Sequence, residues 1–232
     1  MTEPDIRPLA LVTGASGGIG AAVARAIAPT HDVLLGGRDT AQLEALAAEL
    51  PGARPWPVDL TDSAAVAEAA GGILRLDVLV HSAGVGMLGR VADTPAETWR
   101  QQFEVNVVAV AELTRVLLPA LRAAHGHVVL LNSGAGLRAA PGWASYAASK
   151  FALRAFGDAL RAEESENGVR VTSVHPGRVA TEMQRGVAEQ EGGEYRAEHY
   201  LRPESVAGAV LLAVTAPDDA VVTDLVLRPA PR

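Results

Sequence analysis

Short apolar runs alternate along the chain with longer, alanine-rich segments of mixed polarity. The short runs predict seven strands, at residues 9–12, 32–36, 54–58, 76–81, 127–133, 169–175 and 220–227. The longer segments predict helices at residues 21–28, 40–50, 61–70, 97–123, 145–164 and 203–215. This alternation predicts an α/β fold, a three-layer, doubly wound and mostly or wholly parallel sheet in a single domain over residues 1–232. Ligands of such sheets bind at the carboxyl ends of the strands.

A glycine-rich turn joins the first predicted strand to the first predicted helix, and it reads Thr13-Gly14-Ala15-Ser16-Gly17-Gly18-Ile19-Gly20. Glycines let the backbone approach a pyrophosphate, and the free N–H groups at the start of a helix favour its negative charge. The spacing T-G-x-x-x-G-x-G departs from G-x-G-x-x-G. The turn predicts a dinucleotide site of the Rossmann type but no particular reaction, and an ordinary glycine-rich turn is the alternative.

Bulk composition narrows the function classes. The chain is 49% hydrophobic without an apolar run long enough to cross a membrane, and residues 1–7 lack the apolar core of a secretory signal, so we expect a soluble, cytoplasmic protein. The absence of cysteine excludes disulfides, thiolate metal sites and cysteine nucleophiles, and we predict no metal site. A net charge of −7 without a basic cluster argues against a nucleic-acid partner.

The ends of the predicted strands carry candidate cofactor contacts. After the second strand, Gly37 leaves room and Arg38 can meet the 2′-phosphate of NADP(H), although a solvated loop arginine is the alternative. After the third strand, the carboxylate of Asp59, followed by Leu60, accepts either from an adenine amino group or from the next helix as its cap. After the fourth strand, His81 is interpreted as structural, whereas the small residues that follow, Ser82, Ala83 and Gly84, allow a cofactor to approach closely.

Tyr146 lies one helical turn before Lys150, so the two side chains share a helix face. Among 20 lysines and arginines, Lys150 is the only lysine, which indicates that this position requires an amine. A phenol has a pKa near 10, so acid and base work near neutrality requires stabilising its anion by about 4 kcal/mol. A cation about 4 Å away supplies roughly that much at an effective dielectric near 20.

Together with Asn106 and Ser133, the motifs T-G-A-S-G-G-I-G, H-S-A-G, Y-A-A-S-K and Pro176-Gly177 resemble those of the short-chain dehydrogenase/reductase family, in the same order. The resemblance implies hydride transfer between a nicotinamide and a carbonyl or alcohol carbon. Tyr146 would then be the acid and base, and Ser133 would hold the reacting oxygen. Lys150 would lower the tyrosine pKa and bind the nicotinamide ribose, and Asn106 would hold a water linking the lysine to solvent.

The resemblance also assigns a cofactor site for NADP(H), with NAD(H) less favoured. Its residues are Thr13, Gly14, Ser16, Gly17, Gly18, Ile19, Gly20, Arg38, Asp59, Leu60, Ser82, Ala83, Gly84, Tyr146, Lys150, Pro176, Gly177, Val179 and Thr181. Three positions depart from the family pattern. Ser82 replaces the usual asparagine, Gly17 stands where many NADP-preferring relatives have a basic residue, and the segment Leu227-Arg228-Pro229 replaces a common D-G-G ending.

The substrate is expected to be a small molecule in a largely apolar pocket beside Tyr146. The predicted pocket residues are Leu137, Trp143, Met183, Tyr195 and Tyr200. Arg138, Arg185 and Arg196 either meet an acidic substrate group or lie on the surface. The polar segment 181–202 is predicted to be a lid that orders when ligands bind.

The predicted helices 97–123 and 145–164 are apolar on more than one face, so we expect a homo-oligomer, a dimer or a tetramer, in which they pair across two-fold axes. Two other functions remain open at this stage. One is reduction of an imine or an activated C=C bond, and the other is non-catalytic NADP(H) binding by a regulator.

Overall fold

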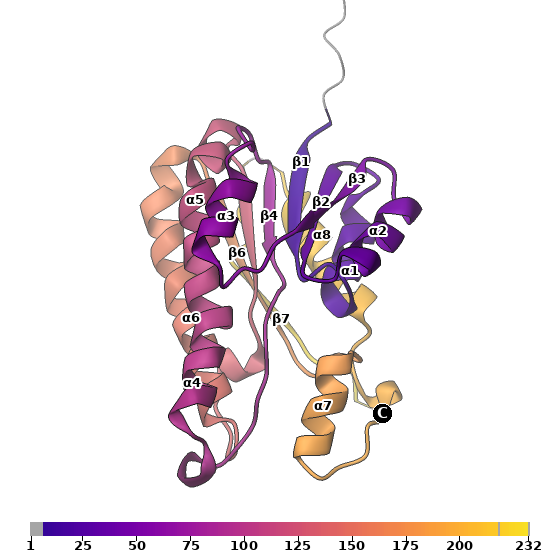
Figure 1. The fold of residues 1–232 in the computed structure, drawn as a ribbon, viewed down its shortest axis with the longest axis vertical. Coiled ribbons are helices and arrows are strands. Elements are labelled where there is room, and N and C mark those ends of the chain that lie inside the picture. Colours follow the sequence, from indigo (N-terminus) through magenta and orange to yellow (C-terminus); the bar gives the residue numbers. More distant parts are fainter. Residues whose placement is uncertain (1–6, 218, 232) are drawn as a thin grey trace, which may run out of the picture.

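A parallel sheet of seven strands forms the centre of the protein in a computed structural model, which describes residues 7–217 and 219–231. The strands lie in the order β3-β2-β1-β4-β5-β6-β7, and every neighbouring pair is parallel (Figure 1). Their bounds are β1 (Leu9–Thr13), β2 (Asp32–Gly37), β3 (Ala53–Pro57), β4 (Val78–His81), β5 (His127–Leu131), β6 (Arg170–Pro176) and β7 (Asp224–Leu227). The predicted α/β fold is therefore confirmed, with a wholly parallel sheet. The order reverses between β1 and β4, which is where such sheets open a ligand crevice.

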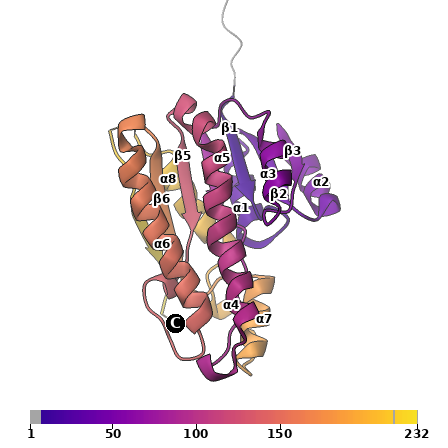
Figure 2. The same cartoon turned by 60° about the vertical axis from the view of Figure 1, so that its left-hand side comes forward.

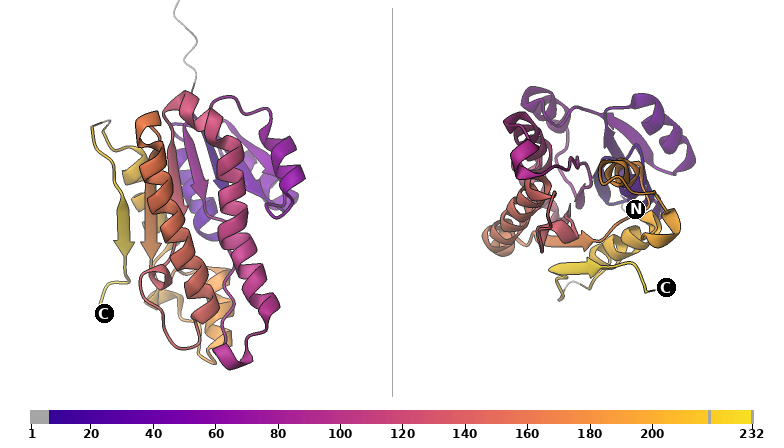
Figure 3. Two further views of the ribbon diagram at one scale, coloured as in Figure 1. Left: turned by 90° about the vertical axis from the view of Figure 1, so that its left-hand side faces the viewer. Right: turned by 90° about the horizontal axis from the view of Figure 1, so that it is seen from below.

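Helices cover both faces of the sheet. One face is covered by α1 (Gly18–Ile27), α2 (Thr40–Glu49) and α8 (Pro203–Val214), and the other by α3 (Ser63–Ala70), α5 (Ala109–Ala124) and α6 (Ala144–Glu164) (Figure 3). Each layer has its own apolar core against the sheet. Two further helices, α4 (Ala96–Phe103) and α7 (Glu182–Gln190), lie beyond the carboxyl ends of the strands (Figure 1).

Side-chain caps account for several helix starts. The Asp39 carboxylate caps α2 by accepting from the Gln42 amide at 3.1 Å. The Asp62 carboxylate caps α3 by accepting from two amides of its first turn, so this helix begins at Ser63 and not at Thr61 as predicted. Pro203 occupies the first turn of α8, where its missing N–H removes nothing.

The predicted helix at 97–123 is interrupted in its first half. A π-helical segment, Glu104–Val108, separates α4 from α5 and contains Asn106. The three pieces remain roughly in line, and α4 and the π-helical segment pack against α6 (Figure 2). Within residues 7–217 and 219–231, no helix is both long and apolar enough to cross a lipid bilayer.

Two segments near the carboxyl end differ from the sequence prediction. The segment 181–202, for which no helix was predicted, contains α7 and a 3-10 turn at Ala197–His199. The last strand is confined to Asp224–Leu227, shorter than the predicted 220–227, because only these residues stay in register with β6.

Candidate active site

The glycine turn between β1 and α1 is packed against the ends of two neighbouring strands. Gly14 has φ +66°, and a Cβ there would lie 2.9 Å from the backbone of Ala83, just after β4. A Cβ at Gly20 would collide with the carbonyl of Gly14. The Ala15 N–H donates to the Gly36 carbonyl near the end of β2, at 2.9 Å. Glycine is therefore required at positions 14 and 20 by close backbone packing.

The start of α1 fits a phosphate group. Gly17 is its N-cap residue and offers no side chain, so among the described residues no side chain caps the first-turn N–H groups. A Cβ built at Gly17 would meet nothing within 4 Å, which shows open space above the turn. Uncapped amides facing open space at a helix N-terminus are a preferred anion site.

Thr13 supports this turn from behind. Its hydroxyl donates to the Val80 carbonyl and accepts from the amides of Ser82 and Ala83, at 3.3, 3.0 and 3.2 Å. The side chain is 1% exposed, so its hydroxyl is used within the protein and not at the predicted cofactor surface. Thr13 holds the ends of β1 and β4 together.

The residues after β2 and β3 lie at the edge of the crevice. Arg38 is exposed and forms no ion pair within the described residues. The Asp59 carboxylate accepts from the amide and hydroxyl of Thr61 at 3.0 and 2.8 Å, and these bonds hold its pKa below the ordinary value. Asp59 therefore closes a local turn and does not cap α3, whereas Leu60 packs against the core beside α3 and α5.

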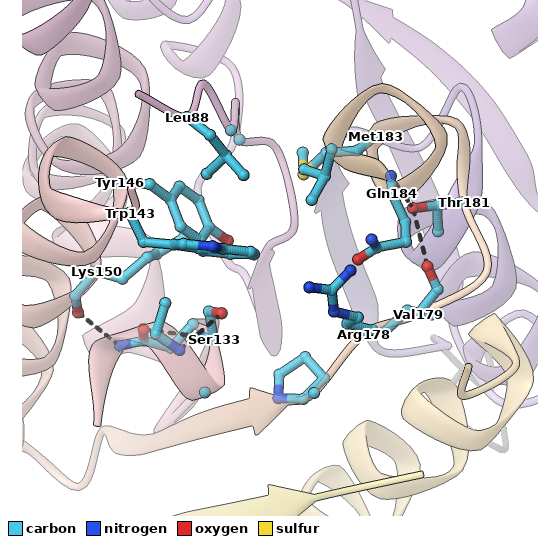
Figure 4. Close-up of a pocket in the computed structure, with 18 of the residues that line it drawn as sticks. Leu88, Ser133, Trp143, Tyr146, Lys150, Arg178, Val179, Thr181, Met183 and Gln184 are labelled. Carbon is cyan, nitrogen blue, oxygen red and sulfur yellow. Dashed lines mark hydrogen bonds between the residues drawn. The ribbon is translucent and has the colours of Figure 1, made fainter. Parts of the chain in front are cut away.

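A cavity of about 610 Å³ opens beyond the carboxyl ends of the central strands. Ser133, Tyr146 and Lys150 all line it, from the end of β5 and from one face of α6 (Figure 4). The side chains of Ser133 and Tyr146 face one another closely enough for the serine hydroxyl to lower the tyrosine pKa. The site also includes these predicted cofactor contacts: Ile19, Ser82, Gly84, Pro176, Gly177, Val179 and Thr181.

The electrostatics of the tyrosine differ from the sequence prediction. Burial raises the pKa of Tyr146, and the Ser133 hydroxyl only partly offsets this. The Lys150 ammonium lies 6.0 Å from the centre of the Tyr146 ring and donates to the Leu131 carbonyl at 3.0 Å. Burial also lowers the pKa of Lys150 to about 8. The expected lowering of the Tyr146 pKa is therefore not found, because desolvation of the phenol is the largest influence on that pKa.

Asn106 is completely buried in the π-helical segment. Its amide nitrogen donates to the Val85 carbonyl and the Ser149 hydroxyl, and its oxygen accepts from the Val85 amide. These bonds fasten the loop after β4 to α6 beside the cavity. Water binding by Asn106 stays a prediction.

His81 is structural, as interpreted from the sequence. Its Nε2 forms a 2.9 Å hydrogen bond with the Thr114 hydroxyl, and the side chain is 2% exposed. Burial lowers its pKa to about 3, which keeps the ring neutral.

The apolar wall of the cavity was predicted only in part. Trp143 and Met183 line it, and the Trp143 ring meets the Tyr146 ring edge-on with centres 5.8 Å apart. Leu137, Tyr195 and Tyr200 do not line it, so their prediction is wrong. The Tyr195 and Tyr200 rings pack on each other, with centres 5.5 Å apart, after the chain turns at Gly192-Gly193.

The predicted arginines separate into two groups. Arg138 lines the cavity, whereas Arg185 and Arg196 pair with Glu182 and Glu194 on the surface. Sequence reasoning missed further lining residues, chiefly Leu88, Arg178, Gln184, Glu191 and Arg228. Arg228 could have been suspected because it lies in the segment Leu227-Arg228-Pro229, which replaces the common D-G-G ending. Leu88 could have been suspected because it lies in the glycine-containing loop that follows β4.

Comparison with known proteins identifies the family. A family model for the short chain dehydrogenases matches residues 8–192. The chain belongs to the short-chain dehydrogenase family. Dehydrogenase/reductase SDR family member 11 of Mus musculus is 34% identical over 243 residues, which cover 95% of this chain and 94% of that protein.

Two other relatives are longer than this short-chain dehydrogenase. The present chain is 34% identical over 235 residues to glycine betaine reductase ATRR of Emericella nidulans, but it spans only 18% of that protein. It is 36% identical over 201 residues to dehydrogenase/reductase SDR family member 7B of Bos taurus and spans 62% of it. In these two alignments, 95% and 80% of this chain are covered.

Solved structures of two dehydrogenases superpose along nearly the whole chain. An alcohol dehydrogenase from Thermococcus sibiricus, complexed with 5-hydroxy-NADP, gives a TM-score of 0.87 at 29% identity and covers 97% of this chain and 99% of that one. A closed form of serine dehydrogenase, complexed with NADP+, gives 0.85 at 28% identity and covers 94% and 93%.

Proposed function

We propose that this protein is an NADP(H)-dependent oxidoreductase that interconverts a carbonyl and a secondary alcohol, with Tyr146 as the general acid and base. The observation that carries the proposal is the meeting of Ser133, Tyr146 and Lys150 at one cavity beside the glycine turn. The cofactor, when bound, supplies or accepts the hydride. The proposal is tested by following NADPH oxidation across a panel of ketones and aldehydes, and absence of turnover with all of them would refute it.

The three side chains divide the proton handling among them. Burial keeps the Tyr146 phenol protonated at neutral pH, so it serves as the acid in carbonyl reduction. The Ser133 hydroxyl faces the phenol and holds the reacting oxygen in line with it. The Lys150 ammonium, below its pKa of about 8, adds the positive charge that stabilises the phenolate after proton transfer.

The choice of NADP(H) over NAD(H) rests on Arg38 in this proposal. Arg38 follows β2, is exposed and has no ion-pair partner in the described part of the chain. Two structural neighbours hold NADP or a derivative of it. An arginine can form charge-assisted hydrogen bonds with a 2′-phosphate.

Replacement of Arg38 by Asp should reverse this preference. We expect the KM for NADPH to rise about tenfold to hundredfold, since the charge-assisted bond contributes roughly 1.5–3 kcal/mol. The KM for NADH should change much less. Steady-state kinetics with both cofactors measure the two values, and an equal rise in both would contradict the assignment.

Other reactions compete with carbonyl reduction. The relatives include proteins named glycine betaine reductase and serine dehydrogenase, so a panel of imines, activated alkenes and amino alcohols belongs beside the ketones. A non-catalytic NADP(H)-binding role would show as cofactor binding without turnover of any compound. Retention of both Tyr146 and Lys150 favours catalysis.

We also propose that residues 181–202 act as a lid over the cavity. Hydrogen bonds already hold it to the loop after β4 and to Arg178, which precedes it in the chain. The Leu88 amide donates to Gln190 at 2.7 Å, and Glu191 accepts from Arg178 at 2.7 and 2.8 Å. Ligand binding should strengthen this closure, so limited proteolysis within 181–202 should slow at least severalfold when NADPH and substrate are present. Unchanged cleavage rates would contradict the lid.

A homo-oligomer is the proposed assembly. Val108 and Phe151 are 49% and 42% exposed on the surface formed by the long helices, and Leu212 and Val226 are 59% and 55% exposed on α8 and β7. Two separate apolar surfaces suit a tetramer built from two kinds of two-fold contact. Light scattering at micromolar concentration should give two or four times the monomer mass, and Phe151→Arg should lower it. A monomeric wild type would refute the proposal.

A further inference from the structure

Arg228 lies at the cavity in a position that the proposed reaction does not use. It follows β7, and its guanidinium faces Gly134, the residue after Ser133. A Cβ built on Gly134 would lie 3.2–3.3 Å from Cζ and both Nη atoms of Arg228, so the flat group covers the space that a side chain at 134 would fill. Its Cδ comes 3.6 Å from a Cβ built on Gly177. Arg228 therefore passes between the two glycines that flank this end of the cavity.

The guanidinium is held on one side only. Nη1 donates to the carbonyls of His175 and Leu227 at 3.2 and 3.0 Å. Nε and Nη2 have no acceptor, and no carboxylate pairs with Arg228, among residues 7–217 and 219–231. The backbone thus orients the charged group and leaves donors for a further acceptor.

A second arginine, Arg138, follows Gly134 in the same loop and also lines the cavity. The Arg138 amide donates to the Gly134 carbonyl at 3.1 Å, and its side chain lines the cavity without an ion pair in the described part of the chain. Arg178, in contrast, is already engaged by Glu191, at 2.7 Å, and lies against the Trp143 ring.

The cavity lining is positively charged, whereas the whole chain carries a negative net charge. The chain carries a net charge of −7, but among the described residues the cavity lining has one carboxylate, Glu191, and that carboxylate is paired with Arg178. The cations of the lining are Arg138, Lys150, Arg178 and Arg228. An apolar cavity with uncompensated arginines favours an anionic ligand group.

We propose that Arg228, with Arg138, binds a carboxylate of the substrate, so that the preferred substrates are oxo acids and hydroxy acids. The inference rests on the proposed carbonyl–alcohol reaction and narrows its substrate class. The carboxylate lies at Gly134, and the reacting carbonyl faces Ser133 and Tyr146. The alternative ligand of the two arginines is an anionic group of the cofactor. The kinetic measurements below distinguish it from a substrate carboxylate.

Matched pairs of an oxo acid and its methyl ester test the proposal. The probes are 3-oxobutanoate, 4-oxopentanoate and 5-oxohexanoate, each with its methyl ester, which vary the distance between carbonyl and carboxylate. For at least one pair, the wild type should turn over the acid with a kcat/KM about tenfold or more above that of the ester. In Arg228→Met, kcat/KM for the acid should fall at least tenfold more than that for the ester. Arg138→Met should act in the same direction, and Arg228→Lys should retain part of the preference.

Arg25→Met is the matched control, because Arg25 pairs with Glu49 on the surface between α1 and α2. It should leave the ratio of acid to ester unchanged. A wild type that turns over all esters as well as their acids, or an acid preference that survives both Arg228→Met and Arg138→Met, would overturn the inference and leave the proposed reaction standing. A rise in the KM for NADPH with an unchanged acid-to-ester ratio would assign the site to the cofactor and also overturn it. Absence of turnover with every acid and ester, and with neutral ketones, would remove the proposed function as well.

Discussion

Tyr146→Phe is expected to lower kcat/KM for carbonyl reduction by about 10³-fold while the protein stays folded and binds NADPH. The change removes one oxygen atom and with it the only phenol that lines the cavity in the described part of the chain. The ring keeps its edge-on contact with Trp143, so the packing of the wall is preserved. Loss of activity would then report the missing proton donor and not a collapsed site.

Tyr195→Phe is the control for this variant. Its phenol belongs to a ring that packs on Tyr200 outside the cavity lining, so most of the activity should remain. NADPH binding, followed by fluorescence, and the melting temperature should stay near wild type in both variants. Wild-type turnover by Tyr146→Phe would exclude Tyr146 as the general acid and base.

The succession of strands and helices along the chain, and the edge of the sheet that carries the site, could be predicted from local patterns. Apolar runs, helical spacing and the glycine turn each depend on residues close in sequence. The parallel arrangement then brings the carboxyl ends of β1, β4, β5 and β6 to one edge. The meeting of Ser133 and Tyr146, which come from separate elements, was expected from the resemblance to the family motifs.

The π-helical segment inside the predicted long helix could not be predicted from neighbouring residues. Asparagine at 106 predicts a disturbance of the helix, but its form depends on contacts with Val85 and Ser149, which are 21 and 43 residues away. These partners satisfy the amide and accompany a π-helical segment. The residues next to Asn106 in the sequence indicate neither of these partners.

The far wall of the cavity could not be predicted for a related reason. Tyr195 and Tyr200 suit an apolar pocket by residue type, but the path of the chain after α7 directs them to each other. Arg228 comes from the last strand, and it reaches Gly134 only because β7 pairs with β6. The tyrosine pKa likewise depends on burial, which no spacing of residues reports.

Lys150→Arg is expected to lower kcat/KM at least 10²-fold, although it keeps the charge and the chain uses arginine at every other basic position. Lys150 is 5% exposed, and its ammonium lies 3.0 Å from the Leu131 carbonyl. Gly84 lies close to that nitrogen, since a Cβ built there would be 3.8 Å from it. A guanidinium would have to displace this loop or turn away from Tyr146.

Arg154→Lys is the matched control, because it makes the opposite exchange on the same helix at an exposed position, with the guanidinium 4.0 Å from Asp158. It should retain wild-type activity. The pH dependence supplies a second readout. Because burial lowers the Lys150 pKa to about 8, the ammonium is charged below that pH and neutral above it. In the wild type, kcat/KM for reduction should therefore decline as the pH rises through about 8.

A guanidinium does not titrate in this range, so the residual activity of Lys150→Arg should lack that decline. The two readouts separate a charge effect from a packing effect. A variant with full activity would show that position 150 needs only a cation, and an unchanged decline near pH 8 would assign that titration to a group other than Lys150.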